Sequence, residues 1–256
     1  MLHPEQFRPP NPTPGGLTSE GKILGTSARY TWNHRRHIRP PIRAADADPT
    51  AISRAIAVGA ERICDSLRQE EWRDTVTAPL LQTVSSTTAR SCLLFGDLID
   101  GNRSWPMDGT DLARFVSDGC GNQDGIHDLV ARRALVATLR QLDIDVRAAR
   151  DSGFPWPMEL FCLFYTQFHI ELMVEIVMHF VCETTLPLVS SVLLRTELGN
   201  WAVERVARLL PNPCEAAKTI PSTSPIRWGV EHAGHAVGDL IAGRPSEPDT
   251  STGEVL

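Results

Sequence analysis

The chain has 256 residues, of which 42% are hydrophobic and 22% charged, and its formal net charge is −6. These values are ordinary for a globular protein and exclude a largely disordered chain, and the length suffices for a buried core in one or two domains. The charge is uneven, because residues 1–43 carry +5 and the remainder carries −11.

Residues 1–47 are predicted to form a disordered, basic arm. Residues 1–21 are rich in Pro, Gly, Thr and Ser, a composition that does not support a packed core. Further along, Tyr30 and Trp32 stand beside four arginines, Arg35, Arg36, Arg39 and Arg43. Residues 29–43 are expected to form a solvated tether. The alternative interpretation is weak contact with nucleic acid or with an anionic membrane surface, for which positive charge and aromatic rings are suited.

Residues 48–210 are predicted to form a helical bundle domain. Asp48 as N-cap and Pro49 in the first turn begin a helix that reaches about residue 69. After a break at Pro79, a second helix is expected over residues 80–99, and a short helix over residues 111–117. Four further helices are predicted, at residues 126–150, 158–183, about 188–198 and 201–210.

Residues 211–243 are predicted to form an extension with one weak helix, and residues 244–256 a disordered tail. Three glycines weaken the helix expected over residues 227–242. No segment alternates convincingly between apolar and polar residues as a strand would. The predicted fold class is therefore all-α, a helical bundle around a central hydrophobic helix.

The central helix belongs to the stretch from Phe154 to Leu194, which holds five of the eight phenylalanines. A membrane-spanning helix needs about 20 mostly apolar residues in a row. Here ionisable residues interrupt the apolar run, namely Glu159, His169, Glu171, Glu175, His179 and Glu183. We therefore expect a buried helix and no transmembrane segment.

A polar stripe recurs every four residues along the central helix, at Gln167, Glu171, Glu175, His179 and Glu183. This spacing keeps the side chains on one side, where they are expected to face solvent, a groove or a partner. The alternative is a bacterial helical-bundle enzyme that binds a metal or a small molecule through Glu171, Glu175 and His179. Di-iron bundles use Glu-x-x-His, however, and Glu175 and His179 are four residues apart. No metal site and no cofactor is predicted.

The six cysteines are scattered singly and form no C-x-x-C motif. Four of them, Cys64, Cys92, Cys162 and Cys182, lie within apolar helical patterns, where a thiol usually behaves as a small hydrophobe. We therefore expect no disulfides and an intracellular, cytoplasmic protein, peripheral to membranes at most. The chain contains no nucleophile elbow, phosphate-binding loop or dinucleotide motif, so an enzyme is not supported.

The order of the predicted helices, together with three short motifs, resembles the Bcl-2 family of apoptosis regulators over roughly residues 49–210. Residues 92–99, Cys-Leu-Leu-Phe-Gly-Asp-Leu-Ile, are similar to the BH3 pattern of an amphipathic helix with a Gly-Asp pair. Residues 151–156, Asp-Ser-Gly-Phe-Pro-Trp, are similar to the BH1 segment. Trp201 follows Gly199-Asn200 where the family often has a BH2 tryptophan.

The resemblance implies a non-enzymatic protein that binds amphipathic partner helices, BH3-like, in a hydrophobic groove and regulates apoptosis. The partner-binding residues that it implies are Cys92, Phe95, Gly96, Asp97, Ile99, Phe154, Trp156, Met158 and Trp201. The family usually follows the BH1 tryptophan with Gly-Arg, and that arginine pairs with an aspartate of the bound helix. In this chain Pro157 and Met158 follow Trp156.

Overall fold

The structure is a computed structural model that describes residues 49–106, 108–121, 125–151, 158–182, 191–220 and 223–245. Its elements are α2 (Pro49–Leu67), α3 (Glu70–Trp72), the π-helix η1 (Arg73–Thr77), α4 (Ala78–Ile99), α5 (Gly109–Cys120), α6 (Ile126–Asp151), α7 (Met158–Cys182), α8 (Ser191–Leu209), α9 (Pro213–Thr219) and α10 (Pro225–Ala242). Every element among the described residues is helical, so the predicted all-α class is confirmed. The basic arm and the tail after residue 245 lie outside the described residues.

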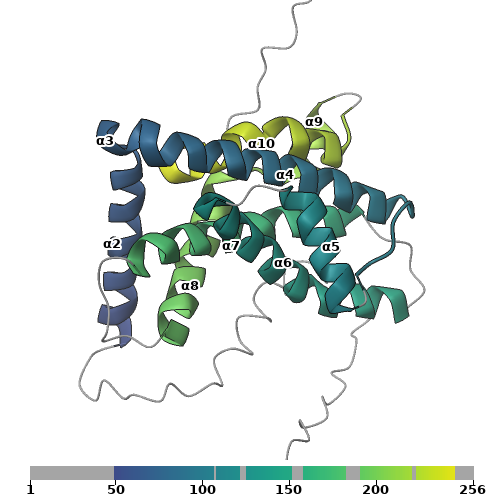
Figure 1. The fold of residues 1–256 in the computed structure, drawn as a ribbon, viewed down its shortest axis with the longest axis horizontal. Helices are drawn as coiled ribbons and strands as arrows, with labels where there is room; N and C mark the ends of the chain where they lie inside the picture. The colour runs from purple at the N-terminus through teal and green to yellow at the C-terminus, as the bar shows by residue number, and fades with distance from the viewer. Residues whose placement is uncertain are drawn as a thin grey trace, which may run out of the picture.

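Helix α7 lies at the centre of the bundle, with α6 and α8 packed against it and α4 and α10 beside it (Figure 1). Of the residues from Leu160 to Val177, only Leu163 and Thr166 are more than slightly exposed. A helix that is buried around its whole circumference must be enclosed by other helices. The expected central helix is therefore present, and it ends one residue before the predicted position.

The core is built on aromatic rings that α4 and α7 contribute. Phe95 of α4 stacks on Phe164 of α7 with ring centroids 4.4 Å apart, and Trp105 meets Phe95 edge-on at 6.1 Å. Phe164 in turn stacks on Phe168. Such pairs stabilise by about 0.5–1.5 kcal/mol each beyond the burial of their area, so this row of rings fixes the position of α4 against α7.

Helix α10 packs along α4 and belongs to the same core as the rest of the bundle (Figure 1). Its N-cap Ser224 accepts a hydrogen bond from the backbone N–H of Arg227 at 3.2 Å, and Gly243 ends it with φ 68°. Gly96 of α4 lets the two helices approach closely, because a Cβ at this position would lie 3.1 Å from Cδ1 of Ile226. Packing against α4 thus stabilises α10, although the glycines of α10 weaken it as an isolated helix.

Helix α8 is longer than predicted, because residues 201–209 continue the helix that begins at Ser191. Its buried Arg205 holds two neighbouring helices. The guanidinium donates to both carboxylate oxygens of Glu61 on α2 at 2.6 Å and to the carbonyl oxygen of Leu240 near the end of α10 at 2.6 Å. A cation at the C-terminus of a helix also complements the helix dipole.

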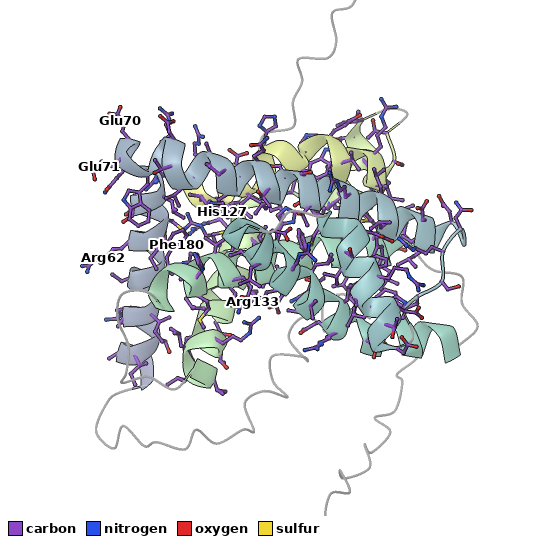
Figure 2. All side chains as sticks on the ribbon, viewed as in Figure 1. Arg62, Glu70, Glu71, His127, Arg133 and Phe180 are labelled. Atoms are coloured by element: carbon purple, nitrogen blue, oxygen red, sulfur yellow. A yellow bond between two sulfur atoms is a disulfide. The ribbon has the colours of Figure 1, made fainter. Side chains whose placement is uncertain are left out.

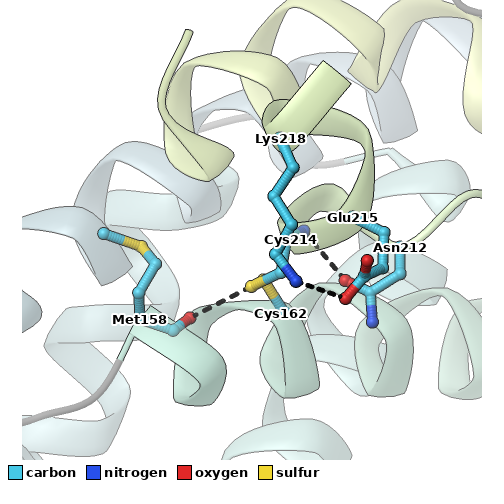
Figure 3. Close-up of a disulfide and its surroundings, with 6 residues drawn as sticks. All are labelled: Met158, Cys162, Asn212, Cys214, Glu215 and Lys218. Atoms are coloured by element: carbon cyan, nitrogen blue, oxygen red, sulfur yellow. Dashed lines mark hydrogen bonds and ion pairs between the residues drawn. A yellow bond between two sulfur atoms is a disulfide. The ribbon is translucent and has the colours of Figure 1, made fainter. Parts of the chain in front are cut away.

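A disulfide joins Cys162 of α7 to Cys214 of α9, so the prediction of no disulfides is wrong (Figure 3). Their Cα atoms lie 6.0 Å apart although 52 residues separate them in sequence. The prediction was based on the apolar helical surroundings of four cysteines, and Cys214 is not among them. The pairing arises because α9, capped by Asn212, folds back onto the first turns of α7. The intracellular location was inferred from the absence of disulfides, and the bond between Cys162 and Cys214 removes that support. The location stays a prediction.

One helix among the described residues, Met158–Phe180, is long and apolar enough to cross a membrane by length and composition alone. Within its most apolar window, 89% of the residues are buried inside the fold. Core helices of soluble proteins pass the same test, so the burial accounts for this composition without a membrane.

Candidate functional site

The residues that the resemblance implied for partner binding lie mostly in the core. Cys92 and Phe95 have no exposed surface, Gly96 is covered by Ile226 of α10, and Asp97 is exposed on the outer side of α4. Ile99 and Met158 are half-buried, and Trp201 is 7% exposed. In this conformation, Cys92, Phe95 and Gly96 cannot touch a partner. Phe154 and Trp156 lie outside the described residues.

Trp201 has a structural contact instead. Its indole N–H donates to Oε1 of Glu61 on α2 at 2.9 Å, and the guanidinium of Arg205 lies 5.4 Å from its ring centroid. Trp201 therefore takes part in the junction between α2 and α8.

The polar stripe of α7 is buried over its first three members. Gln167, Glu171 and Glu175 are 2%, 1% and 6% exposed, so of the three expected surroundings, solvent, a groove or a partner, solvent is excluded for these side chains. Burying a carboxylate is costly unless a partner compensates its charge. That partner comes from α8, the helix that packs on this side of α7.

Arg195 of α8 binds both buried carboxylates. Its Nη2 donates to Oε2 of Glu171 at 2.8 Å, and its Nη1 donates to Oε1 of Glu175 at 2.5 Å. Burial alone would lower the pKa of the Arg195 guanidinium, but hydrogen bonds and charge from Glu175 and Glu171 outweigh it and raise the pKa. Arg195 is thus held charged and in one orientation, with its side chain still 30% exposed.

An open pocket of about 420 Å³ lies beside this ion pair, between α6 and the α7–α8 contact. We call it the arginine pocket. It is lined by four arginines, one glutamate and two small apolar residues, namely Arg132, Arg133, Arg140, Arg195, Glu175, Val136 and Ala137. Asp128 pairs with Arg132, and Glu171 and Glu175 pair with Arg195, so the excess positive charge of the pocket comes from the exposed Arg133 and Arg140.

Helix α6 supplies five of these residues from one face. Residues 132, 136 and 140 are four apart, and so are residues 133 and 137, which places them in two adjacent rows along the helix. Arg132 is fixed by buried Asp128 one turn earlier at 2.5 Å and by the carbonyl oxygen of Gly121 at 2.7 Å. Arg133, labelled in Figure 2, and Arg140 are exposed and pair with no carboxylate among the described residues.

The alternative metal site does not assemble within the described part of the chain. The guanidinium of Arg195 occupies the position beside Glu171 and Glu175 that a metal ion would need. His179 lies at the far end of α7, near His127 of α6, whose pKa is lowered by burial and by the charge of His179. No group of three or more His, Cys, Asp or Glu side chains suited to a metal ion occurs among the described residues.

The free cysteines of the described chain are buried and poorly suited to nucleophilic chemistry. Burial raises the pKa of Cys64 to about 11 and that of Cys120 to about 12, and it also raises the pKa of Cys92. A thiol with a raised pKa is not ionised near neutrality and is a poor nucleophile.

No arginine of α6 is among the residues that the sequence predicts for a site. One local signal was present, since Arg133 has no acidic residue three or four positions away and so no partner on its own helix. The approach of Arg195 from α8 could not be inferred from spacing along α6. No protein-family model, curated protein or solved structure matches the chain, so the geometry of the pocket carries the functional argument.

Proposed function

We propose that this protein is a non-enzymatic binding module whose arginine pocket receives the acidic side of a partner's amphipathic helix. The observation that carries the proposal is the concentration of Arg132, Arg133, Arg140 and Arg195 around one pocket of about 420 Å³. Arginine suits this task because its planar guanidinium binds carboxylates in a bidentate manner and stays charged.

The spread of the arginines favours a helical segment over a single small anion. Arg132 and Arg140 are eight residues apart on α6, which corresponds to about 12 Å along the helix axis. A partner helix with carboxylates at positions i and i+4 presents them about 6 Å apart on one face, within the span of this row. Val136 and Ala137 lie between the arginines and can contact the apolar part of such a helix.

The pocket is organised before any ligand binds. Arg195 is held by Glu171 and Glu175, and Arg132 by Asp128, so these two guanidiniums lose little freedom on binding. Arg133 and Arg140 are exposed and adjust to the ligand. The two fixed guanidiniums would orient the bound helix, and the two exposed ones would allow partners that differ in the positions of their carboxylates.

A narrower form of this proposal is Bcl-2-like regulation of apoptosis. The order of the helices and the Gly96-Asp97 motif support it, and an arginine pocket would supply the cation that is absent after Trp156. The burial of Phe95 and Gly96 argues that a partner helix docks on α6 and not on α4. Titration with a panel of BH3 peptides tests this form, and the absence of binding at high micromolar concentration would exclude it.

The general proposal is tested by fluorescence anisotropy with a labelled helical peptide that carries glutamates at i and i+4. We expect binding that weakens with salt, and no binding of the same peptide with lysines in place of the glutamates. The double variant Arg133→Glu/Arg140→Glu should weaken binding at least tenfold, because it reverses the charge of the two exposed arginines.

The matched control is Arg54→Glu/Arg62→Glu on α2, two exposed arginines eight residues apart; Figure 2 labels Arg62. It changes the net charge by the same amount and should leave the affinity within about twofold. Equal losses in both double variants would mean that net charge alone attracts the peptide, and the proposed site would be wrong.

A further inference from the structure

A second pocket, of about 240 Å³, adjoins the arginine pocket along α6. We call it the Trp105 pocket. It is lined by residues of α5, α6 and the segment before α5, namely Trp105, Pro106, Asp108, Gly109, Leu112, Leu139, Arg140 and Asp143. Arg140 lines both pockets, so a ligand that lies along α6 can reach the two at once.

The size and the wall of the Trp105 pocket suit one long side chain. Small-molecule sites usually measure about 300–1,000 Å³, and this pocket is smaller. Its wall is apolar at Trp105, Leu112 and Leu139, which favours contact with methylene groups. Trp105 is held in place because its indole N–H donates to Oδ1 of Asp143 at 3.3 Å.

The charge of this pocket is opposite to that of its neighbour. Two carboxylates, Asp108 and Asp143, face one guanidinium, whereas four guanidiniums face one carboxylate in the arginine pocket. Both carboxylates already accept hydrogen bonds, Asp108 from the backbone of α5 and Asp143 from Trp105. Asp108 accepts both of its backbone hydrogen bonds through Oδ1, so its Oδ2 can accept a further donor.

We infer that the Trp105 pocket binds a lysine or arginine side chain of the same partner helix. The inference rests on the proposed function. The aliphatic stem of that side chain packs on Trp105 and Leu112, and its cationic head reaches Asp108 and Asp143. Arg140 does not cancel this attraction, because the partner's carboxylates draw its guanidinium toward the arginine pocket. The partner therefore carries acidic and basic residues on one face.

The spacing follows from α6. Val136 lies in the arginine pocket and Asp143 in the Trp105 pocket, and these positions are separated by about 10 Å along the helix, close to two turns. When its nearer acidic residue lies opposite Val136 and the other opposite Arg132, a partner helix parallel or antiparallel to α6 places its basic residue about seven positions from the nearer acidic residue. The charge pattern selects one of the two orientations for any given partner.

The test compares three helical peptides, each with glutamates at i and i+4. One carries lysine seven positions beyond the second glutamate, one carries alanine there, and one carries the lysine on the opposite face; each is made in both sequence orders. In one order, the first peptide should bind about five- to tenfold more tightly than the other two.

The variant Asp108→Asn/Asp143→Asn should abolish that gain and leave the alanine peptide unaffected. Asparagine preserves both structural roles, because its side-chain oxygen caps a helix as well as aspartate does and can still accept from Trp105. The control Asp74→Asn/Asp100→Asn changes two exposed carboxylates outside the pocket and should preserve the gain.

Two outcomes would overturn the inference while the proposed function stands. They are equal affinity for the lysine and alanine peptides, and a gain that persists in Asp108→Asn/Asp143→Asn. A third outcome, in which no peptide binds the wild-type protein, would reject the proposed function and the inference together.

Discussion

The guanidinium of Arg195 on α8 donates to the carboxylate of Glu175 on α7 at 2.5 Å, and it binds buried Glu171 at the same time. This contact explains how a polar stripe fits on the most buried helix of the bundle. It also places a charged, oriented guanidinium at the edge of the arginine pocket. The same residue therefore compensates the core charges and forms part of the proposed binding surface.

Replacing Arg195 by methionine should lower the free energy of unfolding by about 3 kcal/mol, because two buried carboxylates lose their cation. Arg195→Lys should lower it less, since an ammonium group keeps the charge but cannot span both carboxylates as the guanidinium does. Urea denaturation measures both changes. Arg208→Met, an exposed position on the same helix, is the control, and equal stability of the two methionine variants would contradict the role of Arg195.

Removing the disulfide should lower stability by up to about 4 kcal/mol, the loop-closure value for a bridge that spans 52 residues. Cys214→Ala, measured by thermal unfolding, should lower the melting temperature, and a reductant should lower that of the wild type to a similar value. The reductant should have no effect on Cys214→Ala. A wild type that is insensitive to reductant would show that the bond does not form.

Stability should fall on acidification because His169 is buried without its charge. Burial lowers its pKa from 6.5 to about 4. Below pH 6.5, His169 binds a proton in the unfolded chain but not in the folded protein. The free energy of unfolding therefore falls by up to about 3 kcal/mol as the pH is lowered toward 4.

Urea denaturation between pH 5 and 7.5 measures this slope before most carboxylates titrate. His169→Asn should flatten it, since the amide N–H can replace the Nδ1 bond to the carbonyl oxygen of Tyr165 without titrating. The exposed His235 provides the control, and His235→Asn should keep the wild-type slope. An unchanged slope in His169→Asn would place the titrating group elsewhere.

Gly96 tests the packing of α10 on α4. Gly96→Leu should destabilise the protein by about 2 kcal/mol, because its Cβ would already lie 3.1 Å from Ile226. Ile226→Ala in the same chain should recover at least about 1 kcal/mol by making room. A double-mutant cycle in urea measures this coupling, and strictly additive effects would show that Gly96 does not face Ile226.

The sequence predicts the helices better than it predicts the contacts between them. The boundaries of α6 and α7 follow from apolar periodicity and from flanking Gly and Pro, so both agree with the structure within about one residue. Periodicity cannot show which helix covers which. The spacing of Glu171 and Glu175 is compatible with a solvent-facing stripe, and only the packing of α8 shows that Arg195 covers it. The sequence likewise gives Cys214 no partner, because its bond to Cys162 depends on how α9 packs against α7.

The same limit applies to the candidate site. Phe95 and Gly96 belong to an apolar helical pattern that is equally compatible with a groove and with a core. The packing of α10 on α4 shows that they lie in the core. The arginines of α6 are visible in the sequence, but a pocket exists because α7 and α8 form its other wall. Long-range packing, which local spacing does not encode, thus accounts for the differences.

A charge-swap experiment tests the arginine pocket most directly. Arg133→Glu should weaken binding of the glutamate peptide, and replacing one glutamate of the peptide by lysine should weaken its binding to the wild type. When the two changes are combined, we expect the affinity to recover at least fivefold over the value expected from independent effects. Recovery that is absent for every glutamate position, or equal for the control variant Arg62→Glu, would contradict it.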